Sequence, residues 1–124
     1  MPDRLIWISS WQHQCCGKDF AVGSTVTWHV HEPDRAWFST ALGPDLSRRL
    51  DAVEGHHADP VDRTVNGTVR SIAAVHSAYD RESGRWVPGT ATLTRQDPAD
   101  RWTADRDNLR FIGYLVGLTV TPAA

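Results

Sequence analysis

The segment from Val22 to His31 alternates apolar and polar side chains more regularly than any other part of the chain. Its apolar residues stand at even positions, namely Val22, Val26, Trp28 and Val30. Successive side chains of a β-strand point to opposite faces, so this pattern predicts a half-buried strand with its even positions inward. Pro33 ends the strand because proline has no N–H to donate. Such a strand requires further strands to pair with it.

Four other segments have the composition of strands: residues 5–11, 65–79, 85–95 and 109–121. The first and the last are apolar on both faces, which is typical of strands covered on both sides. Gly67, inside the second of them, predicts a bulge or a sharp bend of the kind with which barrels turn corners. The run Asp80-Arg81-Glu82-Ser83-Gly84 predicts a hairpin turn.

Residues 34–54 carry a helical pattern between the second and third strands. Asp34 can cap a helix, and the apolar residues after it recur at helical spacing. Gly43-Pro44 interrupts the pattern, so we expect a broken helix. Because strands and helices do not alternate, a parallel βαβ layout is disfavoured. The sequence therefore predicts a mainly β fold, a small five-stranded barrel of OB or SH3-like type with one broken helical insertion between strands 2 and 3.

The 124 residues suffice for one such core and not for two. We expect a single barrel domain over residues 1–121 and a frayed tail at 122–124. The net charge of −2 gives no electrostatic footprint for nucleic acid, so a nucleic-acid partner is not expected. No apolar run has the length of a membrane helix and no signal peptide is visible, from which we expect a cytoplasmic protein without a membrane partner.

The chain has six tryptophans, many for its length. We expect most of them in the core, while one or two exposed at a rim would favour a binding face. The sequence contains no nucleophile elbow, P-loop, His-Glu-x-x-His or dinucleotide-binding glycine motif. It therefore favours a binding or interaction module without catalytic activity, whose partner is a protein, a peptide or a small molecule.

The two cysteines, Cys15 and Cys16, are adjacent. A cytoplasmic compartment disfavours a disulfide, and sequence neighbours can bridge only through a strained ring. Three interpretations stay open: two small groups packed in a tight turn that ends at Gly17, a zinc site, or a reactive thiolate. Zinc would take His13, Cys15 and Cys16 from one loop and would need a further ligand. A thiolate would need His13 or Lys18 to lower its pKa.

His29 and His31 form a second candidate metal site. They lie on the same face of the predicted strand, near enough to chelate one metal ion. The spacing here, in which Gly23 is followed by five residues and then by His-x-His, resembles the opening of the cupin metal motif. The glutamate that follows in that motif is absent. The alternative is a solvent-facing pair on the polar side of the strand. His76 could complete the site if its strand pairs with this one.

Three short runs near the N-terminus form one motif: Trp11-Gln12-His13-Gln14-Cys15-Cys16-Gly17, Phe20-Ala21-Val22-Gly23 and Val26-Thr27-Trp28. Together they resemble the opening of a family of small bacterial proteins of unknown function. The chain departs from the family pattern at Asp19 and Ser24. The resemblance implies no activity, but it directs attention to Trp11, Gln12, Cys15, Cys16 and Gly17.

We therefore predict a ligand site near the turn after the first strand. Trp11 and Trp28 would form its aromatic walls, and Gln12 would offer directional hydrogen bonds. Zinc, bound through the cysteine loop or through the His-x-His pair, is the alternative.

Overall fold

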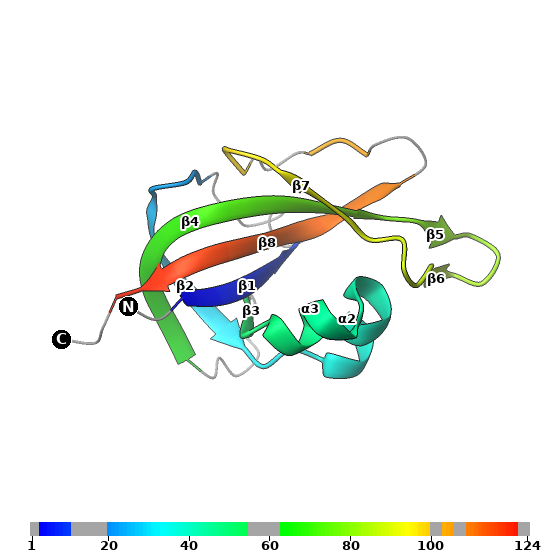
Figure 1. Ribbon diagram of the computed structural model, residues 1–124, viewed down its shortest axis with the longest axis horizontal. Coiled ribbons are helices and arrows are strands. Elements are labelled where there is room, and N and C mark those ends of the chain that lie inside the picture. The colour runs from blue at the N-terminus through cyan, green and yellow to red at the C-terminus, as the bar shows by residue number, and fades with distance from the viewer. Residues whose placement is uncertain (1–2, 11–19, 55–62, 100–102, 106–108, 122–124) are drawn as a thin grey trace.

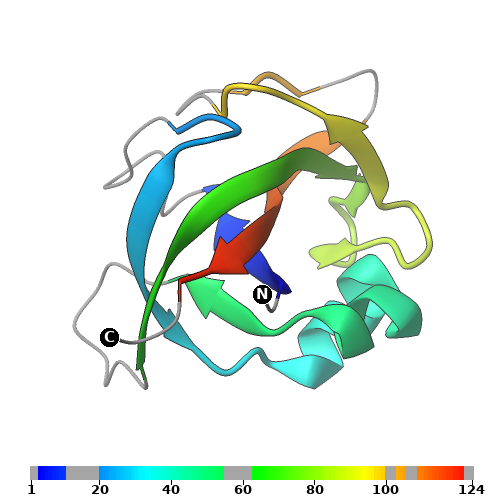
Figure 2. The same cartoon turned by 60° about the vertical axis from the view of Figure 1, so that its left-hand side comes forward.

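The computed structural model describes residues 3–10, 20–54, 63–99, 103–105 and 109–121. Within these residues, five strands close a barrel: β1 (Asp3–Ser9), β2 (Thr25–His31), β3 (Ala52–Glu54), β4 (Arg63–Ser77) and β8 (Arg110–Val120). They pair in the order β2-β3-β1-β8-β4, and β4 pairs again with β2 to complete the ring (Figure 2). The predicted mainly β barrel is confirmed.

The pairing pattern is that of an OB barrel whose chain begins at a different strand. β1 and β3 run parallel, whereas the remaining neighbours in the ring are antiparallel. An OB barrel has the cyclic strand order 1-2-3-5-4, in which strands 3 and 5 are parallel. Counting β4, β8, β1, β2 and β3 as strands 1 to 5 reproduces this order. The fold is thus a circular permutation of the OB arrangement.

Alternate residues of β2 line the inside of the barrel. Val30 is fully buried and Trp28 packs against the same core, while the threonines and histidines between them are exposed. The predicted alternation is therefore confirmed over the length of β2. It is wrong at Val22, which is 46% exposed. Val22 lies in a turn with Gly23, whose positive φ of 94° reverses the chain before the strand begins.

A bulge exchanges the two faces of β4. Val65 and Val69 point into the barrel, but the register against β8 shifts between Val69 and Ser71. Beyond the shift, Val75 packs outside the barrel and His76 is buried. Strict alternation along residues 65–79 predicts that Val75 shares a face with Val65 and that His76 lies on the opposite, polar face. Both predictions are wrong, because one extra residue resets the alternation.

The broken helical insertion consists of α2 (Arg35–Leu42) and α3 (Pro44–Arg49), separated by Gly43. It covers the outside of β1 and β8 beside the barrel (Figure 1) and forms a second core there. The predicted insertion is confirmed, but it ends earlier than expected, since residues 52–54 form β3. A strand of three residues is too short for its alternation to be recognised.

The predicted strand over 85–95 is divided in two. β5 (Tyr79–Asp80) and β6 (Arg85–Trp86) form a hairpin that projects next to α2 (Figure 1). β7 (Thr92–Arg95) pairs separately with β4. Pro88 and Gly89, the latter at a φ of 78°, form the turn between them. The fifth barrel strand is consequently β3.

Among the described residues, no helix is both long enough and apolar enough to cross a membrane.

Candidate functional site

Most residues of the predicted ligand site lie outside the described residues: Trp11, Gln12, Cys15, Cys16 and Gly17. His13, the further ligand of the predicted zinc site at the cysteines, lies outside them as well. Trp28 is described and is half-buried. Its ring meets Phe20 edge to face, with 5.2 Å between the ring centroids, and packs against the barrel interior. Trp28 therefore belongs to the barrel core, and its role as a wall beside Trp11 stays a prediction.

The two histidines of the alternative metal site are both exposed on β2. His29 Nδ1 lies 3.4 Å from the Thr64 hydroxyl, and His31 Nδ1 lies 3.0 Å from the Glu32 carbonyl oxygen. His76 does not join them, because β2 pairs with β4 only as far as residue 68. Within the described part of the chain, no group of three or more His, Cys, Asp or Glu residues is placed to hold a metal ion.

A pocket of about 620 Å³ opens between α2 and the β5–β6 hairpin. Its apolar walls are Trp37 from α2, Trp86 from β6 and Pro88 from the turn that follows. The polar side chains of the lining are Thr40 from α2 and Asp80, Ser83 and Arg85 from the hairpin. The pocket thus combines two indole rings from separate elements with a few hydrogen-bonding groups.

Trp37 is held in place from beneath. It is 38% exposed, yet its ring contacts Phe38 edge-on at 4.9 Å and lies 6.4 Å from the buried Trp7. Asp34 caps α2 by accepting a hydrogen bond from the Trp37 backbone N–H. Gly113 provides the space for Trp7, since a Cβ at that position would lie 2.6 Å from Trp7 Cζ2. The exposed indole therefore stands on a rigid aromatic base.

Trp86 is held by the hairpin. It pairs with Tyr79 across the two strands, with 5.0 Å between the ring centroids. The Arg110 guanidinium lies 4.7 Å from the centre of the Tyr79 ring, a cation–π contact. Val87 N–H donates to the Ala78 carbonyl and closes the base of the hairpin. Both strands are thereby tied to the end of the barrel.

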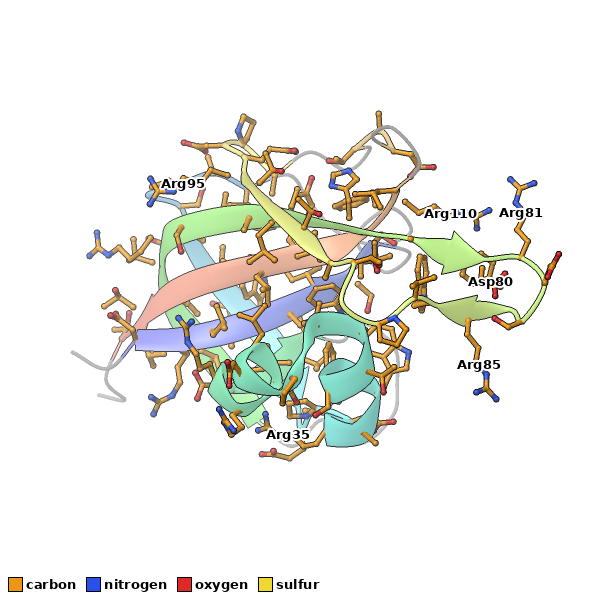
Figure 3. All side chains as sticks on the ribbon, turned by 45° about the vertical axis from the view of Figure 1, so that its right-hand side comes forward. Arg35, Asp80, Arg81, Arg85, Arg95 and Arg110 are labelled. Atoms are coloured by element: carbon orange, nitrogen blue, oxygen red, sulfur yellow. The ribbon has the colours of Figure 1, made fainter. Side chains whose placement is uncertain are left out.

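The hairpin turn supplies the charged groups of the pocket. Asp80 accepts hydrogen bonds from the Ser83 side chain and the Glu82 backbone N–H, which lower its pKa from the usual value. Arg85 points to the side of the hairpin on which α2 lies, whereas Arg81 and Arg110 point away from it (Figure 3). Arg85 has no salt bridge among the described residues. One wall of the pocket thus carries a carboxylate and an available guanidinium.

Residues 3–120 match a family of unknown function, DUF6578. The chain belongs to this family. No curated protein and no solved structure matches the chain significantly. The resemblance at the N-terminus is confirmed as far as membership of a family of unknown function, and the match extends over the whole barrel. DUF6578 membership brings no activity or ligand, so the pocket must be interpreted from its own chemistry.

The pocket of this DUF6578 chain is not apparent from the sequence. The periodicity of the sequence predicts Trp37 on the apolar stripe of a helix and Trp86 among the apolar residues of a strand, and both patterns are typical of core positions. A weak signal was present, because each tryptophan follows a capping or turn residue within a few positions, Asp34 in one case and Gly84 in the other. The approach of α2 to the hairpin depends on tertiary packing and leaves no local pattern.

Proposed function

We propose that this DUF6578 chain is a binding module that takes a small molecule with a ring that stacks on an indole face into the pocket between α2 and the hairpin. The proposal rests on one observation: two indole rings from separate elements line one pocket, and one of them is left exposed. Its volume of about 620 Å³ lies within the range of roughly 300–1,000 Å³ for small-molecule sites. Trp37 and Trp86 would each offer a face for stacking.

The position of the pocket on the barrel supports the proposal. OB barrels bind their ligands over strands 2 and 3 and between the loops 1–2 and 4–5. In this permuted chain those loops are the connection from β4 to β8, which contains the hairpin, and the connection from β2 to β3, which contains α2. The pocket is lined by these two connections. It is therefore formed by the two connections that form OB ligand sites, while the insertion covers the outside of β8 and β1, the counterparts of strands 2 and 3.

The charges favour a ligand that is neutral or carries no large net charge. Asp80, with its lowered pKa, is ionised at neutral pH, and Arg85 stands in the same wall. A polyanion would meet the Asp80 carboxylate and a chain of net charge −2. A ring compound with hydroxyl or amide groups would instead use both residues as hydrogen-bonding partners.

An NMR titration with glucose, adenosine and indole as probes tests the proposal through the indole N–H signals of the tryptophans. We expect one of these ring classes to shift the Trp37 and Trp86 signals saturably. Trp37→Ala and Trp86→Ala should each weaken binding by about tenfold or more, since a stacked aromatic contributes about 1–3 kcal/mol. Leu93→Ala, which removes an exposed apolar side chain on β7, is the matched control and should leave binding unchanged.

Two outcomes would refute the proposal. If none of the three ring classes binds, the pocket is not a ring site. If a probe binds but shifts Trp28 and is insensitive to the Trp37 and Trp86 variants, the ligand site lies at the turn after β1, as the sequence predicted. Zinc bound through His13, Cys15 and Cys16, or through His29 and His31, stays a prediction. The metal content of the purified protein, measured beside Cys15→Ala and His29→Ala, tests it.

A further inference from the structure

A second, smaller pocket of about 360 Å³ lies where β7 meets the bulged part of β4. The lining that bears on its chemistry consists of Val22, Arg70, Ser71, Arg95, Gln96 and Asp97. Arg95 lies at the opposite end of the molecule from Arg81, Arg85 and Arg110 of the hairpin region (Figure 3). This pocket is therefore separate from the ring pocket and differs from it in the residues of its lining, which include two arginines and no aromatic side chain.

The bulge in β4 presents two neighbouring polar side chains together. Regular strand geometry would send consecutive residues to opposite faces of the sheet. The register against β8 shifts between Val69 and Ser71, and Arg70 is the extra residue. As a result Arg70 and Ser71 are both exposed. Bulges that re-aim side chains in this way are common next to functional sites.

The facing strand makes room for this arrangement. The residue paired with Ser71 in β8 is Gly117. A Cβ at Gly117 would collide with the Ser71 hydroxyl oxygen. On the same strand, the Thr119 hydroxyl accepts a hydrogen bond of 3.1 Å from Arg70 Nε. This bond orients the Arg70 guanidinium, and no other described residue forms a hydrogen bond with its two Nη groups.

The two arginines of the pocket outnumber its acidic side chains among the described residues. Within the described residues, Arg70 and Arg95 make no salt bridge. Asp97 adds a carboxylate to the wall, but its Oδ1 accepts a hydrogen bond of 3.0 Å from the Val22 backbone N–H. The described lining has one more positive than negative charge. Guanidinium groups form paired N–H···O bonds with oxyanions, and phosphate suits this geometry.

The walls of the pocket are tied to the barrel. Gln96 N–H donates to the Ile72 carbonyl at 3.1 Å, and the Gln96 side chain donates to the Tyr114 hydroxyl at 2.9 Å. Ala99 N–H donates to the Phe20 carbonyl at 2.7 Å. The segment that carries Arg95 and Asp97 is therefore anchored at both ends. A preorganised site loses less entropy when it binds a ligand.

We propose that this pocket is a binding site for a phosphate group, held by the guanidinium groups of Arg70 and Arg95 and by the Ser71 hydroxyl. The shared chemistry is a dianionic tetrahedral oxyanion, either inorganic phosphate or the monoester group of a small molecule. The site is independent of the ring pocket, so each can fail without the other.

The test is an NMR titration of the full chain with sodium phosphate and, separately, with glycerol phosphate, at an ionic strength kept constant with sodium chloride. We expect saturable shifts of the Arg70 and Arg95 Nε–H signals and of the Ser71 amide. Arg70→Ala and Arg95→Ala should each weaken binding by about fivefold or more, because one charged pair of hydrogen bonds is lost. Arg70→Lys should also weaken phosphate binding, since lysine keeps the positive charge but lacks the paired N–H donors of the guanidinium group.

Arg81→Ala is the matched control, because it removes an exposed arginine of the hairpin and should leave phosphate binding unchanged. Binding of either probe at Arg70 and Arg95 supports the proposal, and the tighter probe identifies the source of the phosphate. The proposal is overturned if the shifts of Arg70 and Arg95 do not saturate, or if Arg81 and Arg85 show shifts of the same size. Binding of a single-stranded oligonucleotide with neither small probe bound overturns it as well.

Discussion

Trp7 and Trp37 lie next to each other in the fold, but one indole ring belongs to the core and the other to the surface. Trp7 is almost fully buried between β8 and the helices, and Trp37 lies over it at the surface. The buried ring depends on a single missing Cβ, at Gly113. The position of the exposed Trp37 ring depends in turn on its contact with the Trp7 ring. A substitution at Gly113 should therefore also change the shape of the ring pocket.

Gly113→Ala should lower the free energy of unfolding. The new Cβ would lie 2.5 Å from the Ile8 carbonyl oxygen and 2.6 Å from Trp7 Cζ2, so β1 or the indole must move. Overpacking of this kind costs about 1–3 kcal/mol, which urea denaturation can measure. Thr92→Ala, an exposed change on β7, is the control and should have little effect. Unchanged stability of the Gly113 variant would contradict the tight contact between Trp7 and β8.

Glu54 makes stability depend on pH. The residue is 2% exposed at the end of β3, and burial raises its pKa from 4.5 to about 7. The folded state holds the Glu54 proton more tightly than the unfolded chain does. The protonated carboxyl therefore contributes fully to the free energy of unfolding below pH 4.5, and this contribution is lost as pH rises from 4.5 to about 7.

Glu54→Gln should therefore flatten the pH dependence of unfolding. Above neutral pH it should raise the free energy of unfolding by on the order of 2 kcal/mol, because no buried carboxylate has to ionise. Urea denaturation between about pH 4 and pH 8 measures this change. Glu82→Gln on the exposed hairpin is the control. A Glu54 variant that loses stability above neutral pH would show that the ionised carboxylate is required in the fold.

At the scale of elements, the β5–β6 hairpin is the part of the pocket with the least support from the barrel. Its two strands have two residues each, and its turn is closed by Asp80 and by the Gly84 N–H, which donates to the Asp80 carbonyl at 2.8 Å. Short hairpins are marginal on their own. The turn hydrogen bonds of Asp80 and the Tyr79–Trp86 contact therefore decide whether the pocket keeps its shape.

Asp80→Ala should increase hydrogen exchange at the Gly84 amide while the exchange of the β4 and β8 amides stays unchanged. The substitution removes the acceptor for the Glu82 N–H and Ser83, so the turn opens locally without unfolding the barrel. The same variant should lower the affinity of the pocket for any ring ligand that it binds. Arg81→Ala, in the same turn, is the control. Equal exchange in both variants would show that the turn does not depend on the carboxylate.

At the scale of the whole molecule, β1 and β8, the first and last strands of the described chain, lie side by side in the barrel. Asp3 of β1 pairs with Thr119 of β8, and the Thr119 hydroxyl donates to Asp3 Oδ1 at 3.0 Å. Joining these ends and opening the chain between β3 and β4 would give the strand sequence β4-β8-β1-β2-β3. That sequence is the order of an unpermuted OB barrel.

A permutant that begins at residue 63, links residue 121 to residue 3 through a short Gly/Ser linker and ends at residue 62 should fold into the same barrel. All pairings of the ring are retained, and permutation is tolerated where the ends lie close together. Cooperative unfolding and the NMR shifts of β8 amides measure this outcome. A permutant opened between Ser71 and Ile72, inside β4, is the control and should not fold. Failure of the first permutant would contradict the assigned ring order.

The sequence by itself determined the elements whose signal is local. The alternation of Val26, Trp28 and Val30 predicts β2, and Asp34 with Gly43 predicts a capped and broken helix, because strand and helix periodicity depend on neighbouring residues only. The N-terminal motif indicated a family of unknown function. From these features the mainly β barrel and its insertion could be predicted.

Only the tertiary structure decided which segments meet. The bulge after Val69 and the strand at 52–54 exist because β8, β1 and β2 are there to pair with them, and no local pattern records that pairing. Both pockets arise in the same way, one where α2 approaches the hairpin and one where β7 meets β4. Contacts between residues far apart in sequence are set by the packing of the whole chain, so the candidate sites could not be derived from the order of residues alone.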